Sequence, residues 1–175
     1  MRTIKQTMTS LGAALQARTD DGATVDRGPS DRSWAILIAR LILGLIFGMA
    51  GAWKVFGLGP LEHARQLFVE PYANTFLPAW ALWATGTVVP FAELSAGALV
   101  IAGLWRRAAL LSLGAVLVLV TFGHLVLEPL YEFHTHVIPR TALLLFVLVM
   151  PASDDWFALD ALLARRRAAR SGLRR

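Results

Sequence analysis

Cysteine is absent from the 175 residues of the sequence. This absence excludes disulfide exchange, thiolate metal ligands and cysteine-held iron–sulfur clusters on this chain. Charged residues are also scarce, at 17%, where soluble domains have roughly 25%. Hydrophobic residues make up 56%. These proportions predict an integral membrane protein, whose redox chemistry would need a bound cofactor or a partner.

Apolar residues gather in four segments. A helix needs about 20 residues to cross roughly 30 Å of hydrocarbon. The segments cover residues 34–56, 77–104, 108–127 and 137–150, and the last is short and begins beside Pro139. We therefore predict an all-α fold, an antiparallel four-helix membrane bundle over residues 33–151. Residues 1–32 form a polar extension that we expect to be poorly ordered, and residues 152–175 a basic amphipathic tail.

Most Lys and Arg residues lie on one side of the predicted spans. They precede the first segment, fill the turn at Arg106 and Arg107, and end the chain. Because basic loops stay in the cytoplasm, both termini are predicted to be cytoplasmic. The net charge of +5 comes from residues that flank apolar runs, so we expect no nucleic-acid binding. The arginine-rich tail is expected to lie on anionic lipid.

Three charged residues lie inside the first two predicted spans, where charge is costly and usually paired. Arg40, Lys54 and the glycines between them share one face of the first segment, and Glu93 lies within the second. Their depths favour an ion pair between Arg40 and Glu93, which would fix helix register. A proton-relay or ligand role is left open for the same residues.

The stretch "TFGHLVLEPLYEFHTHVIPR", residues 121–140, holds three of the four histidines, two glutamates and an arginine between two apolar runs. It could cap helix ends, form the wall of an organic cofactor site, or bind a divalent metal. The candidate metal ligands are His124, Glu128, His134 and His136. The fourth histidine, His63, stands alone in the first loop, and we expect it to be solvated.

The segments "ARLILGLIFGMAGAWKVFG" and "PFAELSAGALVIAGLWRRAALLSLGAVLVLV" resemble the DoxX-like family of four-span bacterial membrane proteins. The resemblance rests on these features: Arg40, Gly51, Lys54, Glu93, Gly97, Arg106 and Arg107. It implies a multi-pass protein of the bacterial inner membrane that serves as a subunit or accessory of a quinone-linked oxidoreductase.

On this interpretation the ligand site lies near the outer face. The residues assigned to the ligand are Lys54, Glu93, His124, Glu128 and Arg140. No sequence motif names a catalytic residue. Two other hypotheses stay open: a metal-binding or permeation protein that uses the histidine and glutamate side chains, and a non-catalytic scaffold for a redox partner. Homo-oligomers are compatible with all three.

Overall fold

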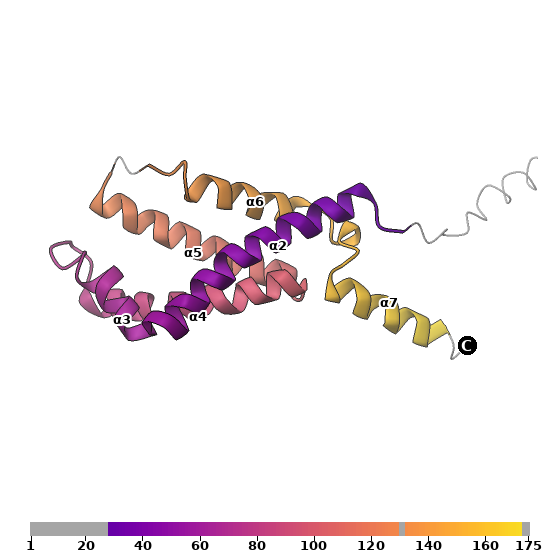
Figure 1. Ribbon diagram of the computed structural model, residues 1–175, viewed down its shortest axis with the longest axis horizontal. Coiled ribbons are helices and arrows are strands. Elements are labelled where there is room, and N and C mark those ends of the chain that lie inside the picture. The colour runs from indigo at the N-terminus through magenta and orange to yellow at the C-terminus, as the bar shows by residue number, and fades with distance from the viewer. Residues whose placement is uncertain (1–27, 130–131, 173–175) are drawn as a thin grey trace, which may run out of the picture. The chain divides into compact units, whose positions relative to one another are not determined.

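The structure, a computed structural model, describes residues 28–129 and 132–172, and all regular elements in these ranges are helical (Figure 1). The expectations for residues 1–27 lie outside the described ranges. The elements are α2 (Asp31–Ala52), η1 (Trp53–Leu58), α3 (Pro60–Ala64), η2 (Arg65–Val69), α4 (Ala79–Ala102), α5 (Arg106–Leu127), α6 (Val137–Val149), η3 (Ala152–Asp154) and α7 (Leu159–Gly172). The all-α prediction is confirmed for these residues.

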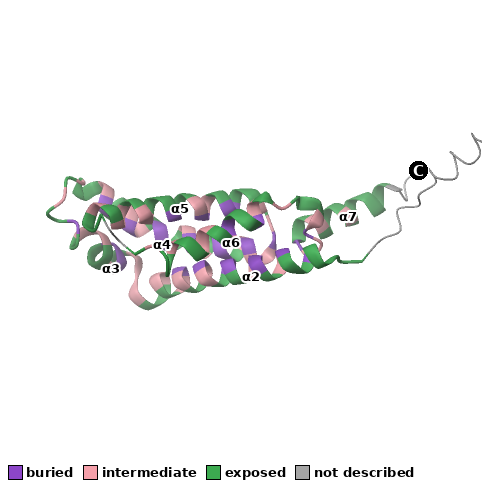
Figure 2. Cartoon of the chain, turned by 90° about the horizontal axis from the view of Figure 1, so that it is seen from above, coloured by how far each residue is buried: buried purple, intermediate pink, exposed green. Residues whose placement is uncertain are grey.

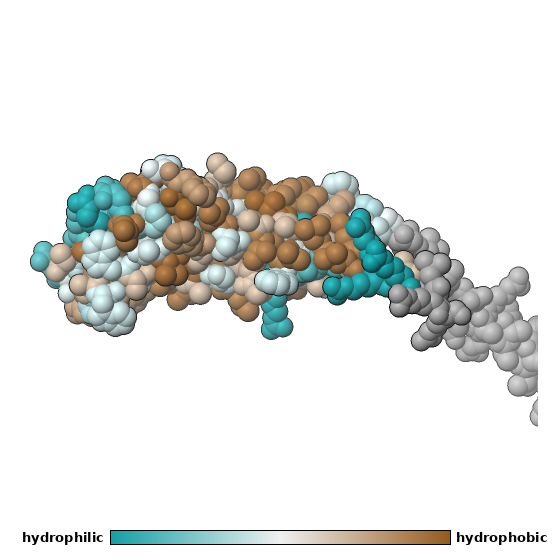
Figure 3. All heavy atoms as spheres, turned by 90° about the horizontal axis from the view of Figure 1, so that it is seen from below, coloured by the Kyte–Doolittle hydropathy of each residue, from teal (hydrophilic) through white to brown (hydrophobic). Residues whose placement is uncertain are grey.

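Among the described residues, three helices are long and apolar enough to cross a membrane, which confirms the first three predicted segments. They are Asp31–Leu58, formed by α2 and η1 together, then α4 and α5. The surface of these helices is largely apolar on the face that Figure 3 shows. With 13 residues, α6 is about 20 Å long at 1.5 Å per residue, shorter than the hydrocarbon core. A fourth span and cytoplasmic termini therefore stay predictions.

The helical body consists of α2, α4, α5 and α6. Helix α2 packs against α4 and α6, and α5 packs against the same two helices. Their shared core is buried and aliphatic, with one large aromatic ring, Phe47 (Figure 2). Leu43, Val100, Leu110 and Leu113 are among its fully buried members. Many exposed positions on these helices are apolar as well, among them Ile38, Val88, Val118 and Leu145, as expected where the surrounding solvent is hydrocarbon.

Glycine lets α2 and α4 approach each other at backbone distance. A Cβ atom on Gly97 would lie 2.5 Å from Gly48 N, and one on Gly51 would lie 2.4 Å from Leu94 N. The glycine face predicted from the sequence is therefore a real helix contact. Because residue 44 meets residue 101 while residue 51 meets residue 94, the two helices run antiparallel.

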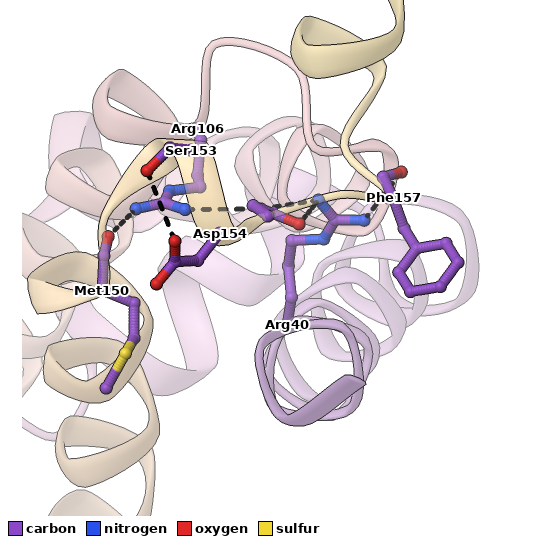
Figure 4. A network of polar contacts seen from close by, with 7 residues as sticks. Arg40, Arg106, Met150, Ser153, Asp154 and Phe157 are labelled. Atoms are coloured by element: carbon purple, nitrogen blue, oxygen red, sulfur yellow. Dashed lines mark hydrogen bonds and ion pairs between the residues drawn. The ribbon is translucent and has the colours of Figure 1, made fainter. Parts of the chain in front are cut away.

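The predicted Arg40–Glu93 ion pair is wrong. Arg40 is 1% exposed, so its inward orientation is confirmed, but its guanidinium donates to both carboxylate oxygens of Asp155 at 2.9 and 3.0 Å. Arg106 lies 3.4 Å from the same carboxylate and donates to the carbonyl of Met150 (Figure 4). The partner of Arg40 lies beyond the spans, in the segment between η3 and α7.

These contacts define two opposite ends of the helical body. The Arg40 end contains Arg40, Arg106 and Asp155. The Lys54 end contains the last turn of the first span and the short helices α3 and η2, which form where a loop is predicted from the sequence. The polar residues at the Lys54 end surround a cavity.

Candidate functional site

A cavity of about 410 Å³ lies at the Lys54 end, between the connection from α2 to α4 and helices α4 and α5. Its wall is mostly apolar, with Leu, Val, Phe and Ala side chains from η2, α4 and α5. The polar side chains in the wall are those of Lys54, His63, Tyr72, Thr85 and His124. An apolar cavity of this size with a few converging polar groups is typical of a small-ligand site.

Lys54 reaches the cavity from η1, a π-helical segment that continues α2. Such wide turns are rare and are frequent at functional sites. The ammonium of Lys54 lies 2.5 Å from a carboxylate oxygen of Glu93, which is 4% exposed. A buried carboxylate needs a cationic partner in a low-dielectric environment, so Glu93 fixes Lys54 against the cavity wall. This pair replaces the predicted Arg40–Glu93 pair.

His63 is 1% exposed, so the expectation that it is solvated is wrong. The cause lies in α4. Pro90 has no N–H and therefore leaves the carbonyl of Gly86, four residues earlier, without its helical donor. His63 Nδ1 lies 2.7 Å from that carbonyl oxygen, which makes Nδ1–H its donor.

The absence of a side chain at Gly86 makes this contact sterically accessible. A Cβ there would lie 2.6 Å from the Cα of Ala64, so α3 packs directly against the α4 backbone. Burial is the main effect on the His63 pKa and lowers it below 6.5, with a smaller decrease from Lys54, while the hydrogen bond to Gly86 and the charge of Glu93 oppose the shift. His63 is therefore neutral at neutral pH.

Tyr72, from the turn after η2, forms another part of the wall. Its hydroxyl lies over Gly123 of α5, where a Cβ would come within 2.8 Å of the oxygen. The ring is 8% exposed, and burial raises the pKa of the phenol. Tyr72 therefore stays protonated and can donate a hydrogen bond into the cavity.

Of the histidine, glutamate and arginine side chains at residues 121–140, only that of His124 lines this cavity. Glu128 caps the end of α5 and is exposed, and its amide N–H donates to the carbonyl of His124. His134 and His136 are exposed as well, and His134 lies 3.9 Å from Glu132. The structure thus separates the residues that the sequence analysis grouped.

Because the candidate metal ligands are separated, they do not form a metal site in the described residues. Within residues 28–129 and 132–172, no three His, Asp or Glu side chains are arranged to hold a metal ion. Arg140 lies on α6, away from the cavity, with its guanidinium 5.9 Å from the centre of the Phe47 ring. That distance is at the limit of a cation–π contact.

Sequence reasoning missed His63, Tyr72 and Asp155. A signal for His63 was present, because a proline within a span frees the carbonyl four residues earlier and a nearby donor is then needed. Tyr72 and Asp155 carry no comparable local signal, since their burial depends on contacts made by distant segments.

The fold and the cavity define a helical integral membrane protein with a ligand-sized site at one end. Comparison with family models identifies its kind: the chain belongs to the family of methylamine utilisation protein MauE, whose model matches residues 32–137. The match covers every residue that lines the cavity. No curated protein and no solved structure matches the chain.

This assignment corrects the resemblance to DoxX-like proteins. The shared features were glycines at a helix contact, charges inside spans and a basic turn. The structure explains these residues by packing and ion pairing, which helical membrane proteins of different families need alike.

Proposed function

We propose that the chain is an accessory membrane protein of methylamine utilisation that binds a quinone-class ligand in the cavity at the Lys54 end. The cavity itself carries the proposal. Its volume suits a substituted ring, its wall is apolar, and Lys54 and Tyr72 offer donors to ring oxygens. The family name supplies the metabolic context, and a redox partner protein would supply or accept electrons.

The position of the cavity supports a lipid-soluble ligand. Leu119 and Phe122 line the cavity and are also 37% and 51% exposed on the outer surface of α5. They therefore separate the cavity from the hydrocarbon by one layer of side chains. A ligand dissolved in the bilayer can enter by displacing these side chains, without crossing the aqueous phase.

A cavity-filling substitution tests the proposal. Ala81 lines the cavity on α4, whereas Ala84, three residues later, is exposed and lies outside the wall. We expect Ala81→Phe to weaken binding of a ubiquinone with a single isoprene unit at least about tenfold, because the added ring occupies the site. Calorimetric titration of detergent-purified protein measures the affinity.

Ala84→Phe adds the same ring to the same helix and should leave the affinity unchanged. Saturable binding that survives Ala81→Phe would place the ligand elsewhere. No saturable binding to the unmodified protein would overturn the proposal and favour a ligand-free scaffold for a partner.

A further inference from the structure

The hydrogen-bonding role of His63 in the cavity wall is fixed by its contact with the α4 backbone. Lys54 donates only, and the protonated Tyr72 phenol offers a donor. A neutral imidazole has one donor nitrogen and one acceptor nitrogen, and a fixed partner on the first determines which is which. At His63 the carbonyl of Gly86 is that partner, at 2.7 Å from Nδ1.

The peptide carbonyl can only accept, so the proton must reside on Nδ1. Nε2 is then an acceptor, and within the described residues no protein group hydrogen-bonds to it. The side chain belongs to the cavity wall, and the Phe68 ring packs against it with centroids 5.5 Å apart. The imidazole is thus held in one tautomer, with a free acceptor nitrogen on a side chain that lines the cavity.

Pro90 is the sequence feature that leaves the Gly86 carbonyl available to His63. Any other residue at this position would supply an N–H for the Gly86 carbonyl, and the imidazole would then compete with the helix for one acceptor. Gly86 and Pro90 together therefore convert a helix carbonyl into a fixed orienting partner. This arrangement parallels sites where a backbone carbonyl sets the tautomer of a working histidine.

We propose that His63 Nε2 accepts a hydrogen bond from the ligand, so that the cavity binds a hydroxyl-bearing quinol more tightly than the oxidised quinone. The inference rests on the proposed function and specifies the redox form of its ligand. A quinol hydroxyl donates to Nε2. A quinone carbonyl at the same place would set two acceptors against each other, which leaves a buried acceptor without a partner. Lys54 and Tyr72 can donate to the oxygens of either form, so these two residues favour neither quinone nor quinol.

The preference should depend on pH. Protonation of His63 turns Nε2 into a donor, and because burial lowers the pKa of this side chain, the change occurs below pH 6.5. The other titratable groups around the cavity are Lys54 from η1, Tyr72 after η2 and His124 from α5, with Glu93 of α4 behind Lys54.

The experiment compares the affinities of a ubiquinone with a single isoprene unit and of its two-electron-reduced quinol. Anaerobic calorimetric titrations of the full-length protein are made at pH 7.5 and pH 5.5. We expect the unmodified protein to prefer quinol by about two- to tenfold at pH 7.5, the range of one neutral hydrogen bond. At pH 5.5 the preference should be weaker than at pH 7.5, in proportion to the share of His63, whose pKa is lowered by burial, that is protonated there.

The variant His63→Asn tests whether His63 causes the preference for quinol. The shorter amide can still donate to the Gly86 carbonyl but has no acceptor at the Nε2 position, so the quinol preference should be lost at both pH values. Quinone binding that persists in this variant shows that the cavity is intact. The matched control is His134→Asn, an exposed histidine outside the cavity, which should keep the preference. The unmodified protein's pH profile tests the inference even if His63→Asn does not fold.

The outcomes separate the two proposals. If neither form binds saturably to the unmodified protein, the proposed function fails and the inference fails with it. If both forms bind with equal affinity at pH 7.5, or if the preference persists in His63→Asn, the inference is overturned while the quinone site stands.

Discussion

Asp155 is the residue on which two arginines of the helical body converge. Its side chain is 1% exposed, and that of Arg40, which it binds through both oxygens, is 2% exposed. Arg106 adds a second cation at 3.4 Å and also donates to the Met150 carbonyl at the end of α6. One carboxylate thus connects the first span, the start of α5 and the segment leading to α7.

Asp155→Asn should destabilise the protein strongly. The amide keeps the side chain's size but removes the charge that compensates Arg40, and breaking a buried ion pair by removing one partner costs about 3–5 kcal/mol. Thermal unfolding in detergent measures the effect. Asp154→Asn is the matched control, because Asp154 is partly exposed and its contact with Arg32, at 3.9 Å, is weak. Equal shifts in both variants would contradict the structural role of Asp155.

Individual residues also show how far sequence reasoning reaches. The inward orientation of Arg40 and Glu93 was predictable, because a charged side chain cannot face hydrocarbon. Their partners were not predictable, since Glu93 had both Arg40 and Lys54 at a plausible depth, and the partner of Arg40, Asp155, lies outside the predicted spans. His63 was misjudged because its burial depends on Gly86 and Pro90, which are distant in sequence.

At the scale of elements, the contact between α2 and α4 depends on the absence of side chains. A Cβ at Gly97 would meet Gly48 N at 2.5 Å and Gly48 Cα at 2.7 Å. Neither backbone atom can move without separating the helices. In the same helix contact, Gly51 packs on the backbone of Pro90 and Leu94, close to the Lys54–Glu93 pair. Helix spacing and cavity geometry are therefore coupled.

Gly97→Ala should destabilise the protein by about 1–3 kcal/mol, the usual cost of overpacking. Gly114→Ala on α5 is the control, because a Cβ there would meet only Leu144 methyl groups at 3.9 and 4.0 Å. That substitution should be neutral or slightly stabilising, since alanine favours helix. Thermal unfolding midpoints of the two variants check this. A neutral Gly97→Ala would mean that α2 and α4 are not held at this distance.

Elements differ in how well the sequence predicts them. Long apolar segments were located to within a few residues, because length and hydropathy alone decide what can span hydrocarbon. The short helices α3 and η2 were missed, because five-residue helices have little stability of their own. They form where Gly86 allows α3 to pack on α4, which is a tertiary cause. The cavity wall depends on these same elements.

For the whole molecule, the two ends of the helical body differ in charge. Arg32, Arg106 and Arg107 lie near the Arg40 end, and α7 adds Arg165, Arg166, Arg167 and Arg170 beyond it. At the Lys54 end, the connection between α2 and α4 carries Arg65, which is paired with Glu62 and Glu70. Because basic segments are retained in the cytoplasm, the Arg40 end is predicted to be cytoplasmic and the cavity to lie near the opposite face.

Single cysteines test this topology without background labelling, because the chain has none of its own. Asn74→Cys lies in the exposed connection at the Lys54 end, and Ala169→Cys lies on the exposed surface of α7. A membrane-impermeant maleimide should label residue 74 in intact cells and residue 169 only after permeabilisation. The reverse pattern would place the cavity at the cytoplasmic face.

The orientation of the protein in the membrane matters for its function. With the predicted orientation, a partner that exchanges electrons with a ligand in the cavity must act at the outer face. Helix α7 then remains available to cytoplasmic lipid headgroups.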